Sequence, residues 1–101
     1  MSDPSSEQFA ECLNSQFQFD AVTGGSVPLE LVDVTKVDYS SRLDNFSLIF
    51  RGPQAPFVPQ GSYRVNHQKL GQMTIFLVPI GVDGAGLQYE AVFNRVRDGV
   101  K

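Results

Sequence analysis

Residues 73–80 (MTIFLVPI) constrain the fold more than any other segment of the chain. Glycines at positions 71 and 81 bracket this run, which carries no charged side chain and is rich in β-branched and aromatic residues. A membrane-spanning helix needs about 20 apolar residues, so the run is too short to cross a bilayer. Its composition indicates a β-strand that is covered on both faces.

Alternation along this strand predicts which side chains share a face. The two expected faces are Met73, Ile75 and Leu77 on one side and Thr74, Phe76 and Val78 on the other. Pro79 has no backbone N–H to donate to a neighbouring strand, so the pairing is expected to weaken or bulge there.

Further segments show the same two-residue period, separated by turn-forming residues. Strands are expected at residues 16–21, 27–35, 46–51, 61–66, 73–80 and 89–94. The polar residues 36–45 form the longest expected loop, and residues 67–71 and 81–86 form shorter turns. No crossover helix separates the later strands, which argues against a parallel sheet. The pattern predicts a mainly β fold, an antiparallel meander of about six strands curled into a small barrel or sandwich.

One short amphipathic helix is expected at the N-terminus, over about residues 4–13. Two helix starts overlap there: an Asp3 N-cap with Pro4 in the first helical position, or a capping box from Ser5 to Gln8. The apolar stripe of this helix consists of Phe9, Cys12 and Leu13. Because so short a helix is unstable alone, the stripe is expected to dock on the sheet and cover one face of strand 73–80.

The whole chain, residues 1–101, is expected to form a single domain with a charged tail at residues 96–101. Eight phenylalanines and no tryptophan predict an interior built from Phe rings. A formal net charge of -3 argues against generic binding to nucleic acids or anionic membranes. The N-terminus lacks the features of a signal peptide, and the single Cys12 cannot form an internal disulfide, which favours the cytoplasm.

No residue pattern points to a catalytic, metal or cofactor site, so we expect a protein that is not an enzyme and needs no cofactor. His67 is the only histidine, and the favoured interpretation places it in a hairpin loop. Cys12 is interpreted as a small buried apolar residue. A catalytic Cys12–His67 pair is the least favoured hypothesis. The glycines at positions 81, 84 and 86 do not follow the order of a dinucleotide-binding fingerprint and favour a turn.

Two glutamates lie in the middle of expected strands. Each of Glu30 and Glu90 is a candidate to pair with Arg51 or Arg64 across neighbouring strands. Such pairs would fix strand register rather than carry out acid–base chemistry.

A proline at every third position between strands 46–51 and 61–66 is typical of polyproline II conformation. The favoured interpretation is a rigid crossover whose Phe57 folds into the core. The alternative is an exposed Phe57 that anchors a protein partner, since a preformed extended segment loses little entropy on docking. The candidate interaction surface comprises Pro53, Pro56, Phe57, Pro59, Arg51 and Arg64.

Several strings together resemble a family of small bacterial domains of unknown function that are associated with phage-tail-collar-like proteins. The strings are FSLIFRGP (46–53), PQGSYR (59–64), LG (70–71), FLVPIG (76–81) and YEAVFN (89–94). The resemblance covers nearly the whole chain, implies a structural or accessory role and carries over no catalytic residues. It also emphasises the polar or amphipathic strand residues Arg51, Tyr63, Arg64, Glu90 and Asn94. These are interpreted as hydrogen-bonding residues, with a shared binding surface as the alternative.

Two functions are therefore expected ahead of catalysis. The first is a non-enzymatic interaction or assembly module, in a phage-tail-like or secretion-related particle, with a protein partner or a second copy of the chain. The alternative is a β-barrel that binds a small ligand in a Phe-lined pocket, with Arg51 or Arg64 meeting a polar group of the ligand.

Overall fold

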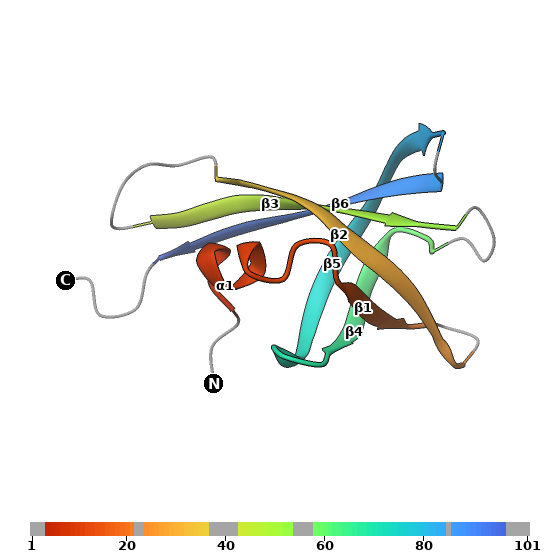
Figure 1. Cartoon of the computed structure of the whole chain (residues 1–101), viewed down its shortest axis with the longest axis horizontal. Coiled ribbons are helices and arrows are strands. Elements are labelled where there is room, and N and C mark those ends of the chain that lie inside the picture. The colour runs from red at the N-terminus through yellow and green to blue at the C-terminus, as the bar shows by residue number, and fades with distance from the viewer. Residues whose placement is uncertain (1–3, 22–23, 37–42, 54–57, 85, 97–101) are drawn as a thin grey trace.

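Alternating inward and outward side chains produce a closed antiparallel barrel of six strands in the computed structural model (Figure 1). The structure describes residues 4–21, 24–36, 43–53, 58–84 and 86–96. The strands are β1 (Gln16–Asp20), β2 (Ser26–Lys36), β3 (Leu43–Gly52), β4 (Gly61–His67), β5 (Gly71–Asp83) and β6 (Gly86–Val96). This confirms the predicted mainly β fold with six strands and one short helix, as a barrel rather than a sandwich.

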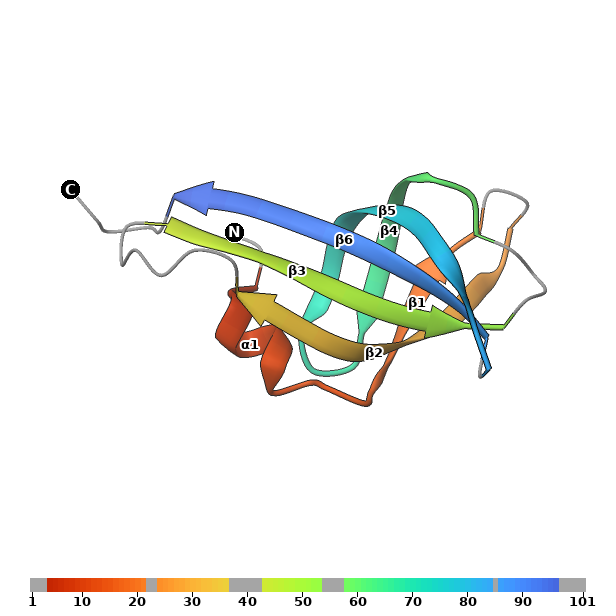
Figure 2. The ribbon, with the colours of Figure 1, turned by 90° about the horizontal axis from the view of Figure 1, so that it is seen from above.

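The strand order is β1-β2-β3-β6-β5-β4, with the barrel closed by β4 against β1. The chain thus forms two three-stranded meanders, and β3 and β6 run side by side past the ends of β4 and β5 (Figure 2). The predicted continuous meander is wrong at one connection, because β3 pairs with β6 and not with β4. Alternation reveals strands, but it does not reveal which distant strand completes the ladder.

Several strands extend beyond their expected bounds. β3 begins at Leu43, inside the segment expected to be a loop, and residues 37–42 of that segment lie outside the described residues. β5 continues to Asp83, which pairs with Gly86 at the start of β6. The Gly86 backbone has a φ of 146°, which L side chains rarely adopt, so glycine allows the two strands to remain paired up to the turn.

Phenylalanine rings fill the barrel, as the composition predicted. The Phe50 ring lies edge-on to Phe17 at 5.4 Å and to Phe19 at 5.2 Å between ring centroids, and all three side chains are buried. Burying one such ring contributes about 1.5–3 kcal/mol, so these rings supply a large part of the stability of the barrel.

The helix α1 (Ser6–Ala10) begins with the predicted capping box. The Gln8 backbone N–H donates to Ser5 Oγ (3.2 Å), and the Ser5 backbone N–H donates to Gln8 Oε1 (2.9 Å). Of the two predicted starts, the Ser5 start is therefore the one that forms. The α-helix is shorter than the predicted 4–13, because turns replace helical structure after Ala10.

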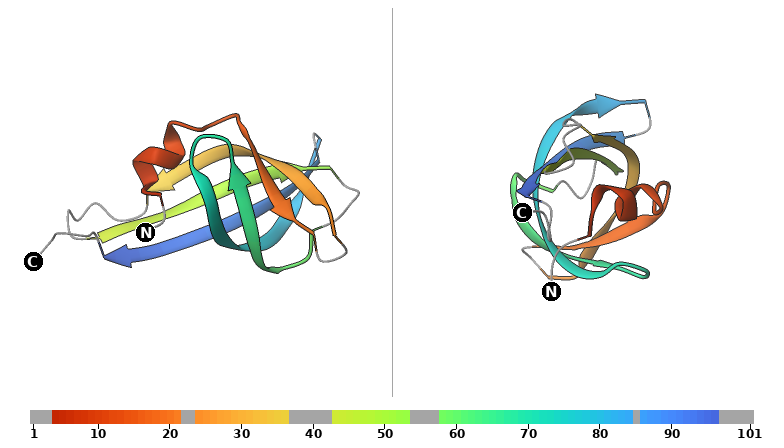
Figure 3. Two further views of the ribbon diagram at one scale, coloured as in Figure 1. Left: turned by 90° about the horizontal axis from the view of Figure 1, so that it is seen from below. Right: turned by 90° about the vertical axis from the view of Figure 1, so that its left-hand side faces the viewer.

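The helix lies beside the end of β2 and packs on β2 and β3 (Figure 3). The Phe9 ring packs against both Phe46 of β3 and Phe93 of β6, at 5.8 and 5.6 Å between ring centroids, and these two rings stack on each other. The prediction that the helix stripe covers β5 is therefore wrong. Phe9 and Cys12 are buried, but Leu13 follows the helix and faces solvent.

The outcome for β5 is mixed. Met73, Ile75 and Leu77, which were predicted to share a face, are all buried, and the strand bulges between Pro79 and Gly81 as the proline predicted. The expectation that both faces are covered is wrong, since Phe76 on the opposite face is exposed. A closed barrel has one interior, so the outer face of a strand is buried only if another element packs on it, and in the described part of the chain the short helix packs elsewhere.

The β5–β6 turn allows a direct test of backbone strain. A Cβ added at Gly86 would overlap the Gly52 carbonyl oxygen, and the positive φ adds strain. We expect Gly86→Ala to lower the free energy of unfolding by roughly 1–3 kcal/mol or more in urea denaturation. Gly84→Ala, in the same turn, is the matched control because its Cβ would meet no atom within 4 Å. Equal stability of the two variants would contradict this account of the turn.

Candidate functional site

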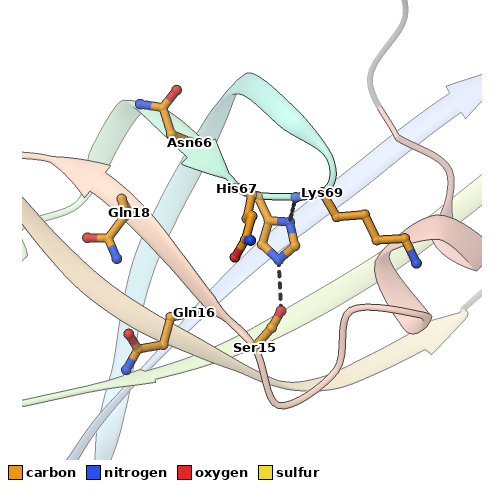
Figure 4. Close-up of a pocket in the computed structure, with 7 residues that line it drawn as sticks. Ser15, Gln16, Gln18, Asn66, His67 and Lys69 are labelled. Atoms are coloured by element: carbon orange, nitrogen blue, oxygen red, sulfur yellow. Dashed lines mark hydrogen bonds between the residues drawn. The ribbon is translucent and has the colours of Figure 1, made fainter.

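A shallow polar pocket lies between β1 and β4, at the seam where the barrel closes (Figure 4). Its lining consists of Ser15, Gln16, Gln18, Asn66, His67, Gln68 and Lys69. The β1–β4 ladder contains only the pairs Gln18 with Asn66 and Phe19 with Val65. The pocket therefore opens where the two strands stop pairing.

His67 forms the base of this pocket. It is the last residue of β4 and it is buried, with its ring against that of Phe17 at 4.2 Å between centroids. Its Nδ1 accepts hydrogen bonds from the backbone N–H groups of Lys69 (3.0 Å) and Leu70 (3.1 Å), and its Nε2 lies 2.8 Å from Ser15 Oγ. The imidazole thus fastens the β4–β5 turn to the segment that leads into β1.

These contacts define the protonation of the ring. Because Nδ1 accepts from two backbone N–H groups, it must present a lone pair, so the ring proton lies on Nε2 and is donated to Ser15. Ser15 Oγ in turn donates to the Cys12 carbonyl oxygen (2.5 Å). A continuous hydrogen-bond chain therefore runs from the β4–β5 turn to the end of the helical segment.

The direction of this series of hydrogen bonds limits the chemistry that its residues can perform. A serine nucleophile must donate its proton to the histidine, whereas here the histidine donates to the serine. Both ring nitrogens of His67 are occupied by Ser15 and by the turn, and neither is bonded to Cys12, which is buried. As arranged, these residues hold two segments together rather than form a nucleophile–base pair.

Electrostatics favour the neutral ring. Burial lowers the pKa of His67, and the nearby Lys69 cation lowers it further. The Lys69 ammonium lies 3.9 Å from Glu11, but both side chains are well exposed, so the pair contributes little to stability. Among the described residues, no group of three His, Cys, Asp or Glu side chains is placed to hold a metal ion.

The predicted interaction surface is spread around the barrel. Pro53 and Pro59 are exposed, and Pro56 and Phe57 lie outside the described residues. Arg51 lies on β3 and Arg64 on β4, strands separated by two others in either direction around the barrel. The structure therefore does not bring the two arginines together.

One predicted cross-strand pair has the expected register. Glu30 lies directly opposite Arg51 in the β2–β3 ladder. Glu90 instead lies opposite Ile49 and Val78. Arg51 lies opposite Gln88, so Glu90 is its diagonal neighbour on β6, while Glu30 lies directly across from Arg51 as expected.

Two tyrosines anchor the end of the proline-rich crossover. The buried Tyr89 hydroxyl accepts from the Val58 backbone N–H (3.1 Å), and the Tyr63 hydroxyl donates to the Pro59 carbonyl oxygen (2.5 Å). Burial and then the neighbouring Tyr89 raise the pKa of Tyr63, which keeps its proton available for this bond. Alternation identified both as strand residues, but not their contacts with the crossover.

A second candidate surface lies on the outside of the barrel. We call it the β5–β6 apolar surface and define it by Phe76, Ile80, Val82 and Val92, which are 51%, 48%, 63% and 55% exposed. Its strands are neighbours in the barrel and pair through Val78 and Glu90. Phe76 and Ile80 belong to the uncharged run 73–80, which was interpreted as a covered strand, whereas Val82 and Val92 lie outside that run.

The protonation of His67 gives a prediction about pH. The unfolded chain has a histidine pKa of about 6.5, and the folded value is lower, so the unfolded state binds a proton that the folded state does not. The stability contributed by His67 is therefore complete above about pH 6.5 and is lost as the pH falls through the folded pKa.

We expect the difference in unfolding free energy between the wild type and His67→Gln to shrink when urea denaturation is repeated below the unfolded pKa. The acidic side chains are common to both proteins, so their titration largely cancels. Lys69→Ala keeps its backbone N–H donor and should raise the pKa of His67 measured by NMR. A difference that is constant or grows on acidification would refute the neutral-ring arrangement.

No helix in the described ranges is long and apolar enough to cross a membrane. No curated protein and no solved structure matches the chain. A protein-family model matches residues 4–93, which include the helix, the complete strands β1 to β5 and most of β6. The chain belongs to the family described as Domain of unknown function (DUF6916).

Proposed function

We propose that this domain is a non-enzymatic interaction or assembly module that associates with a second copy of itself through the β5–β6 apolar surface. The observation that carries the proposal is the position of the exposed apolar side chains. Among the described residues, five large hydrophobic side chains are exposed, and four of them lie on the neighbouring strands β5 and β6. Single exposed apolar residues are ordinary, whereas apolar side chains gathered on one surface are typical of an interaction site.

The charges around this surface favour a second copy as the partner. Arg64 of β4 lies opposite Thr74 of β5, and Glu90 of β6 lies opposite Val78. The row of outward β5 side chains therefore runs between a cation on one neighbouring strand and an anion on the other. A surface that carries both charges can complement an identical surface, which is the requirement of a twofold interface.

The biological setting of this association is a further part of the proposal, and it does not follow from the contacts of the β5–β6 apolar surface. The strings that resemble bacterial domains linked to phage-tail-collar-like proteins support an accessory part of a phage-tail-like or secretion-related particle. We propose the cytoplasm as the compartment, because the chain has a single cysteine and therefore no internal disulfide.

The alternative of a small-ligand-binding barrel with a Phe-lined pocket has less support. Phe17 and Phe19 both pack edge-on against Phe50, so these rings contact one another inside the barrel. The pocket at the β1–β4 seam is lined by polar side chains instead.

The proposal predicts concentration-dependent association of the 11.1 kDa chain. Sedimentation equilibrium should show a dimer. The Phe76→Ser, Ile80→Ser double variant should raise the dissociation constant of this dimer by at least about 30-fold, because burying one such side chain contributes about 2 kcal/mol. Both side chains are half exposed in the isolated barrel, so thermal stability at low concentration should change little.

Ser62→Ala is the matched control, because Ser62 lies opposite Phe76 on β4 and is also exposed. It should leave the dimer intact. A wild type that remains monomeric over the whole concentration range, or a dimer that the double variant does not weaken, would overturn the proposal.

A further inference from the structure

We propose that the pocket at the β1–β4 seam binds an uncharged, hydroxyl-rich ligand, namely a saccharide unit. The inference concerns strands other than β5 and β6, so it does not depend on the proposed self-association. It depends on the chemistry of the side chains that line the pocket and on the rigidity of its base.

The lining is dominated by carboxamides. Gln18 and Asn66 face each other as a ladder pair of β1 and β4, and Gln16 and Gln68 follow where the two strands separate. Figure 4 shows the carboxamides of Gln16, Gln18 and Asn66 on one side of the His67–Ser15 contact. Each carboxamide offers both N–H donors and a carbonyl acceptor, which matches a hydroxyl group that donates and accepts at once.

The charges of the lining favour a neutral ligand. No carboxylate lines the pocket, so it lacks the groups that attract a cation. Lys69 is the single side chain of the lining with a permanent charge, and its ammonium lies 3.9 Å from Glu11. In Figure 4 the Lys69 side chain extends away from the three carboxamides, so it does not prepare their side of the pocket for an anion.

Two other polar ligands fit less well. A nucleobase gains much of its affinity from stacking on an aromatic face, but the one ring of the lining, His67, is buried against Phe17. An added peptide strand needs a free strand edge, whereas at the pocket end of β1 only Gln16 and Phe17 lie beyond the β1–β4 ladder. The hydroxyl groups of a saccharide can be bound by carboxamide hydrogen bonds without an aromatic face or a free strand edge.

The base of the pocket is already fixed in position. His67 is held by the turn N–H groups and by Ser15, and Ser15 is held by the Cys12 carbonyl oxygen. The Gln18 carbonyl oxygen accepts from the Ser26 hydroxyl at 3.3 Å, which directs its amide as a donor. A site whose polar groups are held before binding loses less entropy on binding.

The test is a titration of the full chain, labelled with ¹⁵N, with maltose, cellobiose and N,N′-diacetylchitobiose in separate NMR experiments. At least one disaccharide should shift the side-chain amide signals of Gln18 and Asn66, with a dissociation constant of about 1–10 mM, equivalent to about 3–4 kcal/mol. The Gln18→Ala, Asn66→Ala double variant should weaken that binding at least tenfold.

Gln72→Ala is the matched control. Gln72 is an exposed carboxamide that lies opposite Asn66 on β5 but does not line the pocket, so binding should be unchanged. Adenosine and sodium phosphate are the comparison probes, and neither should shift the same signals. The inference is overturned if no disaccharide shifts them, if the double variant binds as the wild type does, or if adenosine or phosphate binds there instead. Unchanged backbone spectra of the variants establish that they fold.

Discussion

The barrel depends on aromatic packing across the seam between β1 and β4. These strands share only two residue pairs, so backbone hydrogen bonds alone hold the seam weakly. Phe17 of β1 packs on His67 of β4, and Phe19 packs on Tyr63 of the same strand, at 4.2 and 6.3 Å between ring centroids. Each inward ring of β1 thus meets an aromatic ring of β4, which compensates for the short ladder.

The same seam explains why the helix contributes to closure although it contacts neither β4 nor β5 closely. The Phe9 ring lies 6.1 Å from Phe17 and also reaches Phe46 of β3. Asn14 and Ser15 exchange backbone hydrogen bonds with Leu31, just beyond the last β1–β2 pair. The helical segment therefore supports β1 from the end at which its own ladder stops.

The sequence predicted the elements of this fold better than their arrangement. Alternation identified six strands because each has one face in the Phe core, and the capping box and the bulge at Pro79 follow from local chemistry. The pairing of β3 with β6 was not predictable in this way, because it depends on contacts between distant segments. The exposure of Phe76 was missed because composition does not reveal whether another element covers the outer face.

The polar pocket was almost invisible in the sequence for a related reason. Gln16 and Gln18 alternate with Phe17 and Phe19, so the pattern places them outward but assigns them no partner. His67 was expected in a loop, whereas its place as the inward residue that ends β4 gives it both a ring contact and the turn N–H groups. These contacts arise only when β4 returns to β1.

The pocket, His67 and the β1–β4 seam are therefore formed by the same residues and should respond together. The His67 ring holds the β4–β5 turn and also packs on Phe17. Protonation of His67 would therefore place a donor at Nδ1 against two backbone N–H donors, next to the short β1–β4 ladder. A ligand that bonds Gln18 and Asn66 together would act in the opposite direction, because these residues belong to the two strands that the seam must join. Acidification and ligand binding should consequently have opposing effects on the same short ladder.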